Sequence, residues 1–388
     1  MKNVTGALGW IFATLFISDG AVAAPSNFEF QDNRIIIQVM INGQGPFHMM
    51  FDTGATNILS NELAKALRLR QYDRFSVSGG GENALSASYC DVQSLEITDH
   101  VLEGSRFICM DIADMQKAIG FPRLDGLIGY EVFSQFLTEI NFDKMEITLR
   151  SFSARPQPVK GESVIALSFQ GTMPVVEAVL DGVAGNFWLD TGDRASATLS
   201  LPFIQKNLLR QKYNPKLSMM TGYGLGGPMK TSMVFADELT LGDLDFSKIL
   251  IRLPDMKSKG LNDPASAGTL GMGILRQFNL VFDYARKEMV LSRNSVFQQD
   301  RSFDRSGMWI VPAQGGFLVM DVLEQGPAWS AGIRTGDRIL RVNGVEVSKI
   351  NIFQLRVRLK DPEQRQVVFS IQQGGQTKRV TVYLRDLL

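Results

Sequence analysis

The stretch that decides the fold is an apolar run ending in Asp-Thr-Gly, namely Met49-Met50-Phe51-Asp52-Thr53-Gly54. The same tripeptide ends a second apolar run, Phe187-Trp188-Leu189-Asp190-Thr191-Gly192. Two carboxyl groups held about 3 Å apart cannot both ionise, so they share one proton and their pKa values separate. One can then act as a base on water while the other donates a proton. Asp52 and Asp190 are therefore the candidate catalytic pair.

The other residues of each tripeptide have supporting roles. The hydroxyl groups of Thr53 and Thr191 can bond across to the opposite half of the molecule, and Gly54 and Gly192 allow a turn tight enough for backbone N–H groups to reach a carboxylate. A single Asp-Thr-Gly is an ordinary turn. Two of them in duplicated surroundings are a strong signal.

The duplication extends beyond the tripeptides. A possible helix cap follows each motif, at Ser60 and at Ser200, and Leu127-Ile128-Gly129 is echoed by Thr269-Leu270-Gly271. Between these landmarks, short runs of Val, Ile and Phe are separated by Gly, Asn and Asp, which favours strands and hairpins. The sequence predicts a mainly β fold with two pseudo-symmetric lobes, residues 24–155 and 156–296.

The last part of the chain, residues 302–388, has a pattern of its own. The run from Gly326 to Gly344 resembles a PDZ domain. In such domains an extended peptide adds to a sheet edge, and backbone N–H groups of the preceding loop hold its C-terminal carboxylate. The resemblance implies a helix of the groove at Asn351 to Lys360, a receiving strand at Phe317 to Val322, and peptide-binding residues Gly315, Gly316, Phe317, Leu318 and Val319. A β domain that only supports the rest of the molecule is the alternative.

The two Asp-Thr-Gly motifs and the Leu-Ile-Gly segment resemble the pepsin/retropepsin group of aspartic proteases. Nearest in length and motifs are bacterial retropepsin-like aspartyl proteases with a C-terminal PDZ domain, and the similarity spans nearly all of the chain after residue 24. The resemblance implies that Asp52 and Asp190 form the catalytic dyad. It also implies that the Leu-Ile-Gly and Leu-Gly segments run behind the motif strands and hold them rigid.

Such proteases cover their substrate with glycine-rich hairpins called flaps. Each half offers one at a similar distance after its motif, with flap candidates Gly79, Gly80 and Gly81 in the first half and Gly224 and Gly226 in the second. Plain surface hairpins are the alternative, since glycine is common in turns. The spacing Gly222, Gly224, Gly227 matches a phosphate-binding pattern, but Pro228 stands where the required helix would begin.

Two residues depart from the pepsin pattern. Ala55 stands where pepsin-like enzymes have a hydroxyl that bonds the catalytic carboxylate, and its absence is expected to raise the pKa values of the pair. Asp193 follows Gly192 directly. We expect it either to pair with Arg194 or to point at the dyad, in which case lobe two would be degenerate.

Bulk composition limits the remaining possibilities. The chain has 388 residues with 40 basic and 40 acidic side chains, so nothing favours nucleic acid as a partner. A basic start, a short apolar core and Ala21-Val22-Ala23 predict a signal peptide over residues 1–23 and export to the periplasm or medium. Nothing later is apolar enough to cross a membrane. Two Cys and two His give no metal-ligand spacing, and the sequence leaves open whether Cys90 and Cys109 pair.

These observations lead to one functional hypothesis and one rival. The first is an aspartic endopeptidase that cleaves extended polypeptides with water activated between two carboxylates, without a metal or cofactor, and uses a PDZ domain for substrate or C-terminus recognition. The rival is a catalytically degenerate, protease-like protein that binds peptides in the cell envelope, and Asp193 motivates it.

Overall fold

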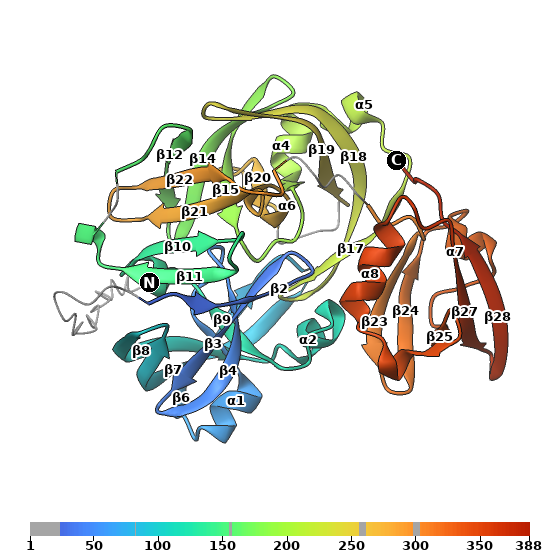
Figure 1. Cartoon of the computed structure of the whole chain (residues 1–388), viewed down its shortest axis with the longest axis horizontal. Coiled ribbons are helices and arrows are strands. Elements are labelled where there is room, and N and C mark those ends of the chain that lie inside the picture. The colour runs from blue at the N-terminus through green and yellow to red at the C-terminus, as the bar shows by residue number, and fades with distance from the viewer. Residues whose placement is uncertain (1–23, 82, 155–156, 256–260, 298–302) are drawn as a thin grey trace, which may run out of the picture.

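The structure is a computed structural model that describes residues 24–81, 83–154, 157–255, 261–297 and 303–388. The predicted signal peptide, residues 1–23, lies outside this range. The described residues form two eight-stranded and two six-stranded sheets with a few short helices (Figure 1). The predicted fold class, two β-rich lobes followed by a β-rich C-terminal domain, is confirmed.

Lobe one is built on an eight-stranded sheet in the order β2-β3-β4-β9-β5-β8-β7-β6. Its strands are β2 Glu29–Gln31, β3 Arg34–Ile41, β4 Gln44–Phe51, β5 Ile58–Ser60, β6 Gln71–Ser78, β7 Ala84–Ile97, β8 His100–Met110 and β9 Leu124–Ile128. Its helices are α1 Asn61–Ala66, α2 Ala113–Ile119 and α3 Tyr130–Phe133. A disulfide between Cys90 and Cys109 joins β7 to β8.

Lobe two repeats this sheet in the order β13-β14-β15-β20-β16-β19-β18-β17, which is the order of lobe one with every label raised by 11. Its strands are β13 Ser168–Gln170, β14 Met173–Leu180, β15 Val183–Asp190, β16 Ala197–Leu199, β17 Ser218–Gly224, β18 Gly227–Leu241, β19 Leu244–Pro254 and β20 Gly268–Gly271. Its helices are α4 Leu201–Lys206, α5 Leu209–Tyr213 and α6 Met272–Leu275. The duplication seen in the sequence is thus a duplication of topology.

Both predicted helix caps are present. The hydroxyl group of Ser60 accepts a hydrogen bond from Leu63 N at 3.0 Å, and that of Ser200 accepts one from Phe203 N at 3.3 Å. Each bond satisfies a backbone donor that the first turn of a helix leaves free. The strand–turn–helix path after each motif is therefore fixed by local chemistry.

A six-stranded sheet joins the lobes in the order β1-β11-β10-β21-β22-β12. Its strands are β1 Ser26–Asn27, β10 Leu137–Asn141, β11 Glu146–Arg150, β12 Glu162–Ala166, β21 Phe278–Asp283 and β22 Glu288–Arg293, with the short 3₁₀ helix η1 Phe152–Ala154 between β11 and β12. The lobes meet where β10 pairs with β21. One apolar core runs through both lobes and includes Phe51, Phe133, Phe187 and Phe282, so the strands that end in the motifs are anchored in shared packing.

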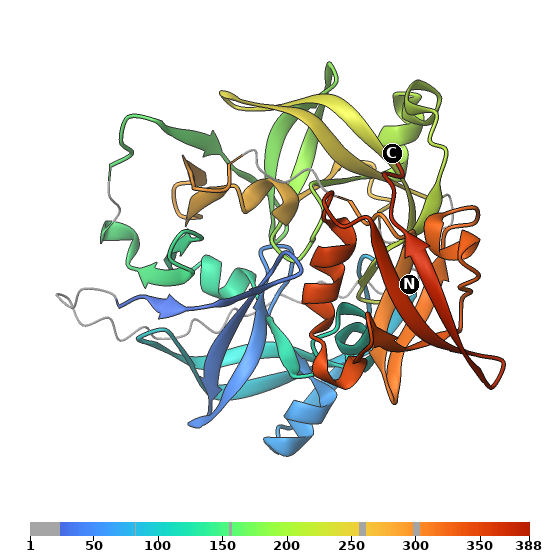
Figure 2. The same cartoon turned by 45° about the vertical axis from the view of Figure 1, so that its right-hand side comes forward.

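The C-terminal domain has a sheet in the order β23-β24-β25-β27-β28, with β26 paired to β25. Its elements are β23 Met308–Ala313, β24 Gly316–Val322, α7 Pro327–Ser330, β25 Arg338–Val342, β26 Val345–Glu346, η2 Val347–Lys349, α8 Ile352–Lys360, β27 Gln366–Gln373 and β28 Gln376–Tyr383. It has its own apolar core. Viewed from a second direction, α8 lies between this sheet and the two lobes (Figure 2).

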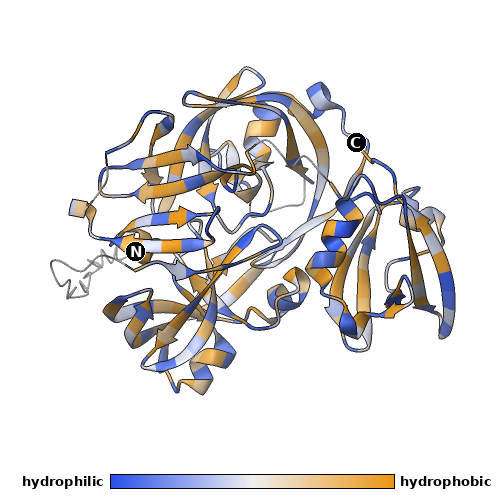
Figure 3. Cartoon of the chain, in the orientation of Figure 1, coloured by the Kyte–Doolittle hydropathy of each residue, from blue (hydrophilic) through white to orange (hydrophobic). Residues whose placement is uncertain are grey.

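Apolar and polar residues alternate along many strands of both lobes and of the C-terminal domain (Figure 3). This alternation is typical of sheets with one face buried. Among the residues that the structure describes, none of the helices has the length and apolar composition to span a membrane.

Candidate active site

The two Asp-Thr-Gly motifs lie at the same place in the two lobes. β4 ends at Phe51 and β15 ends at Asp190, and each strand is followed directly by the turn of its motif. A parallel strand pairs with each one as its neighbour in the same sheet. Phe51 pairs with Ile128 of β9, and Asp190 pairs with Gly271 of β20. The Leu-Ile-Gly and Leu-Gly segments, which were expected behind the motif strands, therefore lie beside them as hydrogen-bonded neighbours.

The two threonines of the motifs bind across the lobe boundary. Thr53 Oγ1 donates to the carbonyl of Leu189 at 2.9 Å, and Thr191 Oγ1 donates to the carbonyl of Phe51 at 2.8 Å. Each hydroxyl also accepts from the other residue's backbone, at 3.0 Å for Thr191 N and 2.9 Å for Thr53 N. Both side chains are fully buried. These four bonds fix the position of one motif relative to the other.

The carboxyl groups of Asp52 and Asp190 face each other and share a side-chain hydrogen bond. Asp52 Oδ1 accepts from Gly54 N and Asp190 Oδ1 accepts from Gly192 N, each at 2.8 Å. The glycines leave room for the opposite carboxyl group. A Cβ at Gly192 would lie 2.3 Å from Asp52 Oδ2, and one at Gly54 would lie 2.7 Å from Asp190 Cγ. All six residues of the predicted dyad and its support thus come together.

The surroundings of Asp52 and Asp190 give the two carboxyl groups different pKa values. Burial raises the pKa of Asp52, although the N–H group of Gly54 offsets part of that effect. Burial together with the negative charges of Asp52 and Asp193 raises the pKa of Asp190 well above its ordinary value. The shared proton therefore favours Asp190 and the charge favours Asp52.

Asp193 points neither at Arg194 nor at the dyad. Its carboxylate pairs with Arg252 of β19 at 3.1 Å and accepts from Thr198 Oγ1 at 2.8 Å and Thr269 Oγ1 at 3.0 Å. Burial alone would raise its pKa, but Arg252 and these hydrogen bonds lower it. Its backbone N–H donates to Asp190 Oδ1 at 3.0 Å. The partner expected from sequence was wrong, because Arg252 lies on a strand that only the fold brings close.

The two flap candidates are hairpins whose tips touch. β6 and β7 form the first and β17 and β18 the second. Gly81 N donates to the carbonyl of Leu225 at 2.8 Å, and Asn83 N donates to that of Gly226 at 2.9 Å. Of the other candidates, Gly79 lies against Leu225, and Gly80 lies against Gly224.

The flaps are also connected to the motif of lobe one. Val77 of the first hairpin and Leu225 of the second pack against the same apolar cluster as Ala55, which follows Gly54 directly. Both hairpins therefore share one apolar cluster with the residue that follows the Asp52 motif.

The predicted peptide-binding strand of the C-terminal domain does not fit the structure. Gly316, Phe317, Leu318 and Val319 belong to β24, and Gly315 lies in the turn before it. β24 is bonded to β23 on one side and to β25 on the other, so it has no free edge for a peptide. The strands at the two ends of this sheet are β23 and β28, so the edge next to β24 belongs to β23. The helix expected over Asn351 to Lys360 is present as α8, capped by Asn351.

Three arginines hold the surroundings of Asp190, and the sequence predicted none of their ion pairs correctly. Arg252 binds Asp193, while Arg194 and Arg356 both bind Asp32. Two of them left a signal in the sequence. Arg252 interrupts the apolar run Ile249 to Leu253, and Arg356 lies one turn from Ile352 on the apolar face of a helix; a charge in either place predicts a buried partner.

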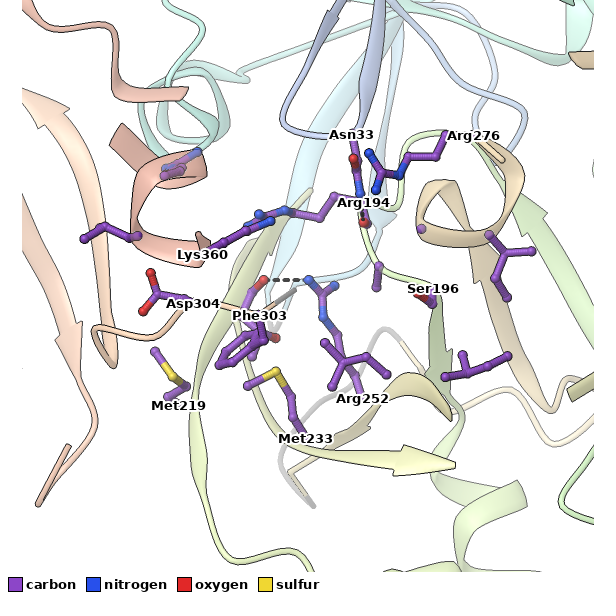
Figure 4. A pocket seen from close by; sticks show the side chains of 18 of the residues that line it. Asn33, Arg194, Ser196, Met219, Met233, Arg252, Arg276, Phe303, Asp304 and Lys360 are labelled. Atoms are coloured by element: carbon purple, nitrogen blue, oxygen red, sulfur yellow. Dashed lines mark hydrogen bonds between the residues drawn. The ribbon is translucent and has the colours of Figure 1, made fainter. Parts of the chain in front are cut away.

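A cavity with an empty volume of about 1320 Å³, counting its open mouth, lies between lobe two and the C-terminal domain (Figure 4). Arg194, Arg252 and Lys360 reach it from three different segments, and Met219 and Met233 line another side. Neither Asp52 nor Asp190 lines this cavity. It lies behind the Asp190 turn, so it is a different place from the dyad. Within the described ranges, no group of three or more His, Cys, Asp or Glu could hold a metal ion.

Parts of the chain match known protein families and solved structures. Residues 37–132 match the family model of aspartyl proteases, and residues 303–384 match that of PDZ domains. A retropepsin-like aspartic protease from Rickettsia conorii is similar at 20% identity, covering 34% of this chain and 89% of that one, with a TM-score of 0.25. An aspartic proteinase from Irpex lacteus is similar at 11% identity, covering 72% and 99%, with a TM-score of 0.47. No curated protein matches the chain.

Proposed function

We propose that this chain is an aspartic endopeptidase that hydrolyses peptide bonds of extended polypeptides. The observation that supports the proposal most is the pair of carboxyl groups of Asp52, which is buried, and Asp190, which is partly buried. They share a hydrogen bond and are fixed by threonines that bind across the lobes. Such a pair keeps one proton over a pH range in which isolated carboxyl groups would have lost theirs.

The reaction follows from the unequal pKa values. Water lies between the carboxyl groups, and Asp52, the ionised member, takes a proton from it as its oxygen attacks the peptide carbonyl carbon. Asp190 gives its proton to the carbonyl oxygen, so a neutral gem-diol forms. In the second step protonated Asp52 gives its proton to the amide nitrogen, and ionised Asp190 takes a proton from one hydroxyl of the gem-diol. The C–N bond breaks, a carboxylic acid and an amine leave, and the dyad is back in its starting protonation state.

The flaps supply the substrate site in this proposal. Their tips bond to each other through Gly81 and Leu225, so a polypeptide enters only after these contacts open. Closure would then exclude water other than the nucleophile. Apolar side chains around Ala55, including Val77 and Leu225, favour substrates with large apolar residues near the cleaved bond.

The test is cleavage of an unfolded polypeptide by the purified chain from about pH 4 to about pH 8. Wild-type protein is expected to shorten the polypeptide, while Asp52→Asn and Asp190→Asn are expected to leave it intact and remain folded. Asp237→Asn, at an exposed position of β18, is the matched control and is expected to retain full activity. Full activity in either dyad variant would refute the proposal.

The rival hypothesis, a peptide-binding protein without catalysis, depended on Asp193 facing the dyad. Because Asp193 instead forms an ion pair with Arg252, it gives no reason to expect an inactive dyad. Binding of the polypeptide without cleavage at every pH would nevertheless favour the rival, so the same experiment decides between the two.

We also propose that the chain is exported and that its signal peptide is removed after Ala23. Two features support this. The disulfide of Cys90 and Cys109 suits an oxidising compartment, and Ala24 N lies 3.0 Å from Asp99 Oδ2, where the new amino terminus would meet a carboxylate. N-terminal sequencing of protein from the cell envelope is expected to begin at Ala24. Recovery of the intact terminus from the cytoplasm would contradict the proposal.

A further inference from the structure

The groove of the C-terminal domain lies between the free edge of β23 and helix α8, and it is not empty. The segment 118–121, at the C-terminal end of lobe-one helix α2, occupies the position beside β23 (Figure 1). Ala118 packs with Trp309 and Val311 of β23. Gly120 lies so close to α8 that a Cβ there would be 2.9 Å from Ile352 Cγ2.

Arg356 of α8 binds this segment from inside the groove. Its guanidinium donates to the carbonyls of Ala118 at 3.1 Å and Ile119 at 3.0 Å, and also to the carbonyl of Ile310 on β23 at 2.8 Å. The last carbonyls of a helix have no partner within it, so a cation there is favourable. Arg356 thus fills the gap that a peptide strand would otherwise bridge.

The loop before β23 is occupied as well. In PDZ domains, backbone N–H groups of this loop hold the terminal carboxylate of a peptide. Here the N–H groups of Ser306 and Gly307 donate to Asp304 Oδ1 at 2.9 and 2.8 Å. An internal carboxylate therefore takes the bonds that a ligand would need.

The same arginine reaches the surroundings of the dyad through one intermediate. Asp32 lies between Arg356 at 3.0 Å and Arg194 at 2.7 Å, and all three side chains are buried. Asn33 Nδ2 also donates to the carbonyl of Arg194 at 2.8 Å. Arg194 follows Asp193, whose backbone N–H binds the carboxyl group of Asp190.

The indole ring of Trp309 strengthens this connection. The guanidinium carbon of Arg194 lies 5.2 Å from its ring centre and that of Arg356 lies 5.0 Å away. An aromatic ring between two cations holds both by cation–π attraction. A second link ties the domain to the flaps, since Met220 N at the base of the second hairpin donates to Asp321 Oδ2 at 2.6 Å.

We propose that the PDZ groove is filled by the chain's own segment 118–121, and that Arg356 is a positioning residue which acts through Asp32 and Arg194 to hold the Asp190 turn. The catalytic part of this inference rests on the proposed function. It follows that the intact chain does not take an external peptide by strand addition to β23, and that the C-terminal domain is required for cleavage itself.

The test compares Arg356→Ala, Arg356→Lys and the control Arg358→Ala in the full chain. Arg358 lies on the same helix but is exposed, so its loss leaves the groove unchanged. For Arg356→Ala we expect kcat to fall roughly 10- to 100-fold with KM within about threefold, because a displaced catalytic group lowers the rate more than binding. Lys keeps the charge but cannot serve four acceptors, so part of the loss is expected to remain.

Two readouts do not depend on activity. Hydrogen exchange of residues 113–121 and 193–196 is expected to accelerate in Arg356→Ala and to stay unchanged in Arg358→Ala. A fluorescent peptide with a free C-terminal valine is expected not to bind the wild-type chain. Wild-type kcat and exchange in Arg356→Ala, or saturable binding of that peptide to the wild type but not of its amidated form, would overturn the proposal. A wild-type chain without any cleavage activity would refute the proposed function, while exchange would still test the filled groove.

Discussion

Lobe one and lobe two end the same strand in the same tripeptide, but the next residue differs. In lobe one it is Ala55, which packs against an apolar cluster. In lobe two it is Asp193, which pairs with buried Arg252 and places a negative charge beside Asp190. Burial and the charge of Asp52 are the larger causes of the raised pKa of Asp190, and the negative charge of Asp193 adds to them, whereas Ala55 brings no charge to Asp52. An unequal pair has a defined acid and a defined base before substrate arrives.

The lobes also differ in how they are held. Lobe one has a disulfide between β7 and β8, whereas the corresponding strands β18 and β19 have no cysteine. Lobe two instead has the buried ion pair and the cluster formed by Arg194, Asp32 and Arg356. The Asp190 turn of lobe two is therefore supported by ion pairs that involve lobe one and the C-terminal domain.

The largest expected effect comes from removing a feature that both lobes share. Gly192→Ala and Gly54→Ala each place a Cβ within 2.7 Å of the opposite carboxyl group, so the dyad must separate. We expect a loss of kcat of about 100-fold or more in both variants, measured on an unfolded polypeptide. Gly104→Ala is the control for activity: it is an exposed residue of β8, a Cβ there meets no atom within 4 Å, and its φ of +67° makes the substitution cost stability without touching the dyad. Near-normal cleavage in either variant would contradict the close approach of the two acids.

The second largest expected effect comes from a residue that only lobe two has. Asp193→Asn removes the partner of buried Arg252, and we expect the free energy of unfolding to fall by about 3 to 5 kcal/mol in urea titrations. It also removes a negative charge near Asp190, so the pKa of Asp190 falls and the alkaline limb of kcat/KM moves to lower pH. An unchanged alkaline limb would show that Asp193 does not create the inequality.

The same variant changes how stability depends on pH. The pKa of Asp193 is lowered in the fold, so its contribution is present above the ordinary carboxyl pKa and is lost as pH falls through the folded value. The raised pKa of Asp190 acts oppositely, since its contribution is present at low pH and is lost as pH rises through the folded value. Asp193→Asn should therefore lose less stability on acidification than the wild type.

The sequence predicts the features that depend on contacts between residues close together in the chain. The repeated tripeptide, the Ser60 and Ser200 caps and the supporting Leu-Ile-Gly segment depend on neighbours in the chain, and all are present, although the Leu-Ile-Gly segment lies beside its motif strand and not behind it. The pairing of Asp52 with Asp190 could be predicted because the same motif in two similar lobes meets at a pseudo-two-fold axis.

The features that sequence did not predict depend on contacts between distant segments. The partner of Asp193 is 59 residues away on another strand, and Arg356 meets Ala118 across 238 residues. The same holds for Gly315 to Val319, which were assigned to a peptide-binding edge. A local pattern identifies a strand, but only pairing on both sides shows that β24 is interior.

A smaller effect tests the symmetric part of the comparison. Thr53→Val and Thr191→Val each leave a buried carbonyl and a buried N–H without a partner. We expect each to lower the free energy of unfolding by about 2 to 4 kcal/mol. Thr138→Val is the control, because its hydroxyl makes one long bond of 3.4 Å. Clearly unequal losses would show that the two motifs are not held in the same way.

The smallest effect comes from Ala55→Ser, which gives lobe one the hydroxyl that it lacks. The N–H group of Ala55 already donates to the backbone carbonyl of Asp52 at 3.3 Å, so we expect the added hydroxyl to donate to the carboxyl group of Asp52. A donor stabilises the ionised form, so we expect the pKa of Asp52 to fall and the acid limb of kcat/KM to move to lower pH, with kcat at the optimum within about threefold of wild type. The alkaline limb, which reports Asp190 and its neighbour Asp193, should move less. An acid limb that stays in place or rises would mean that the apolar setting of Ala55 does not influence Asp52, and that the inequality of the pair arises in lobe two alone.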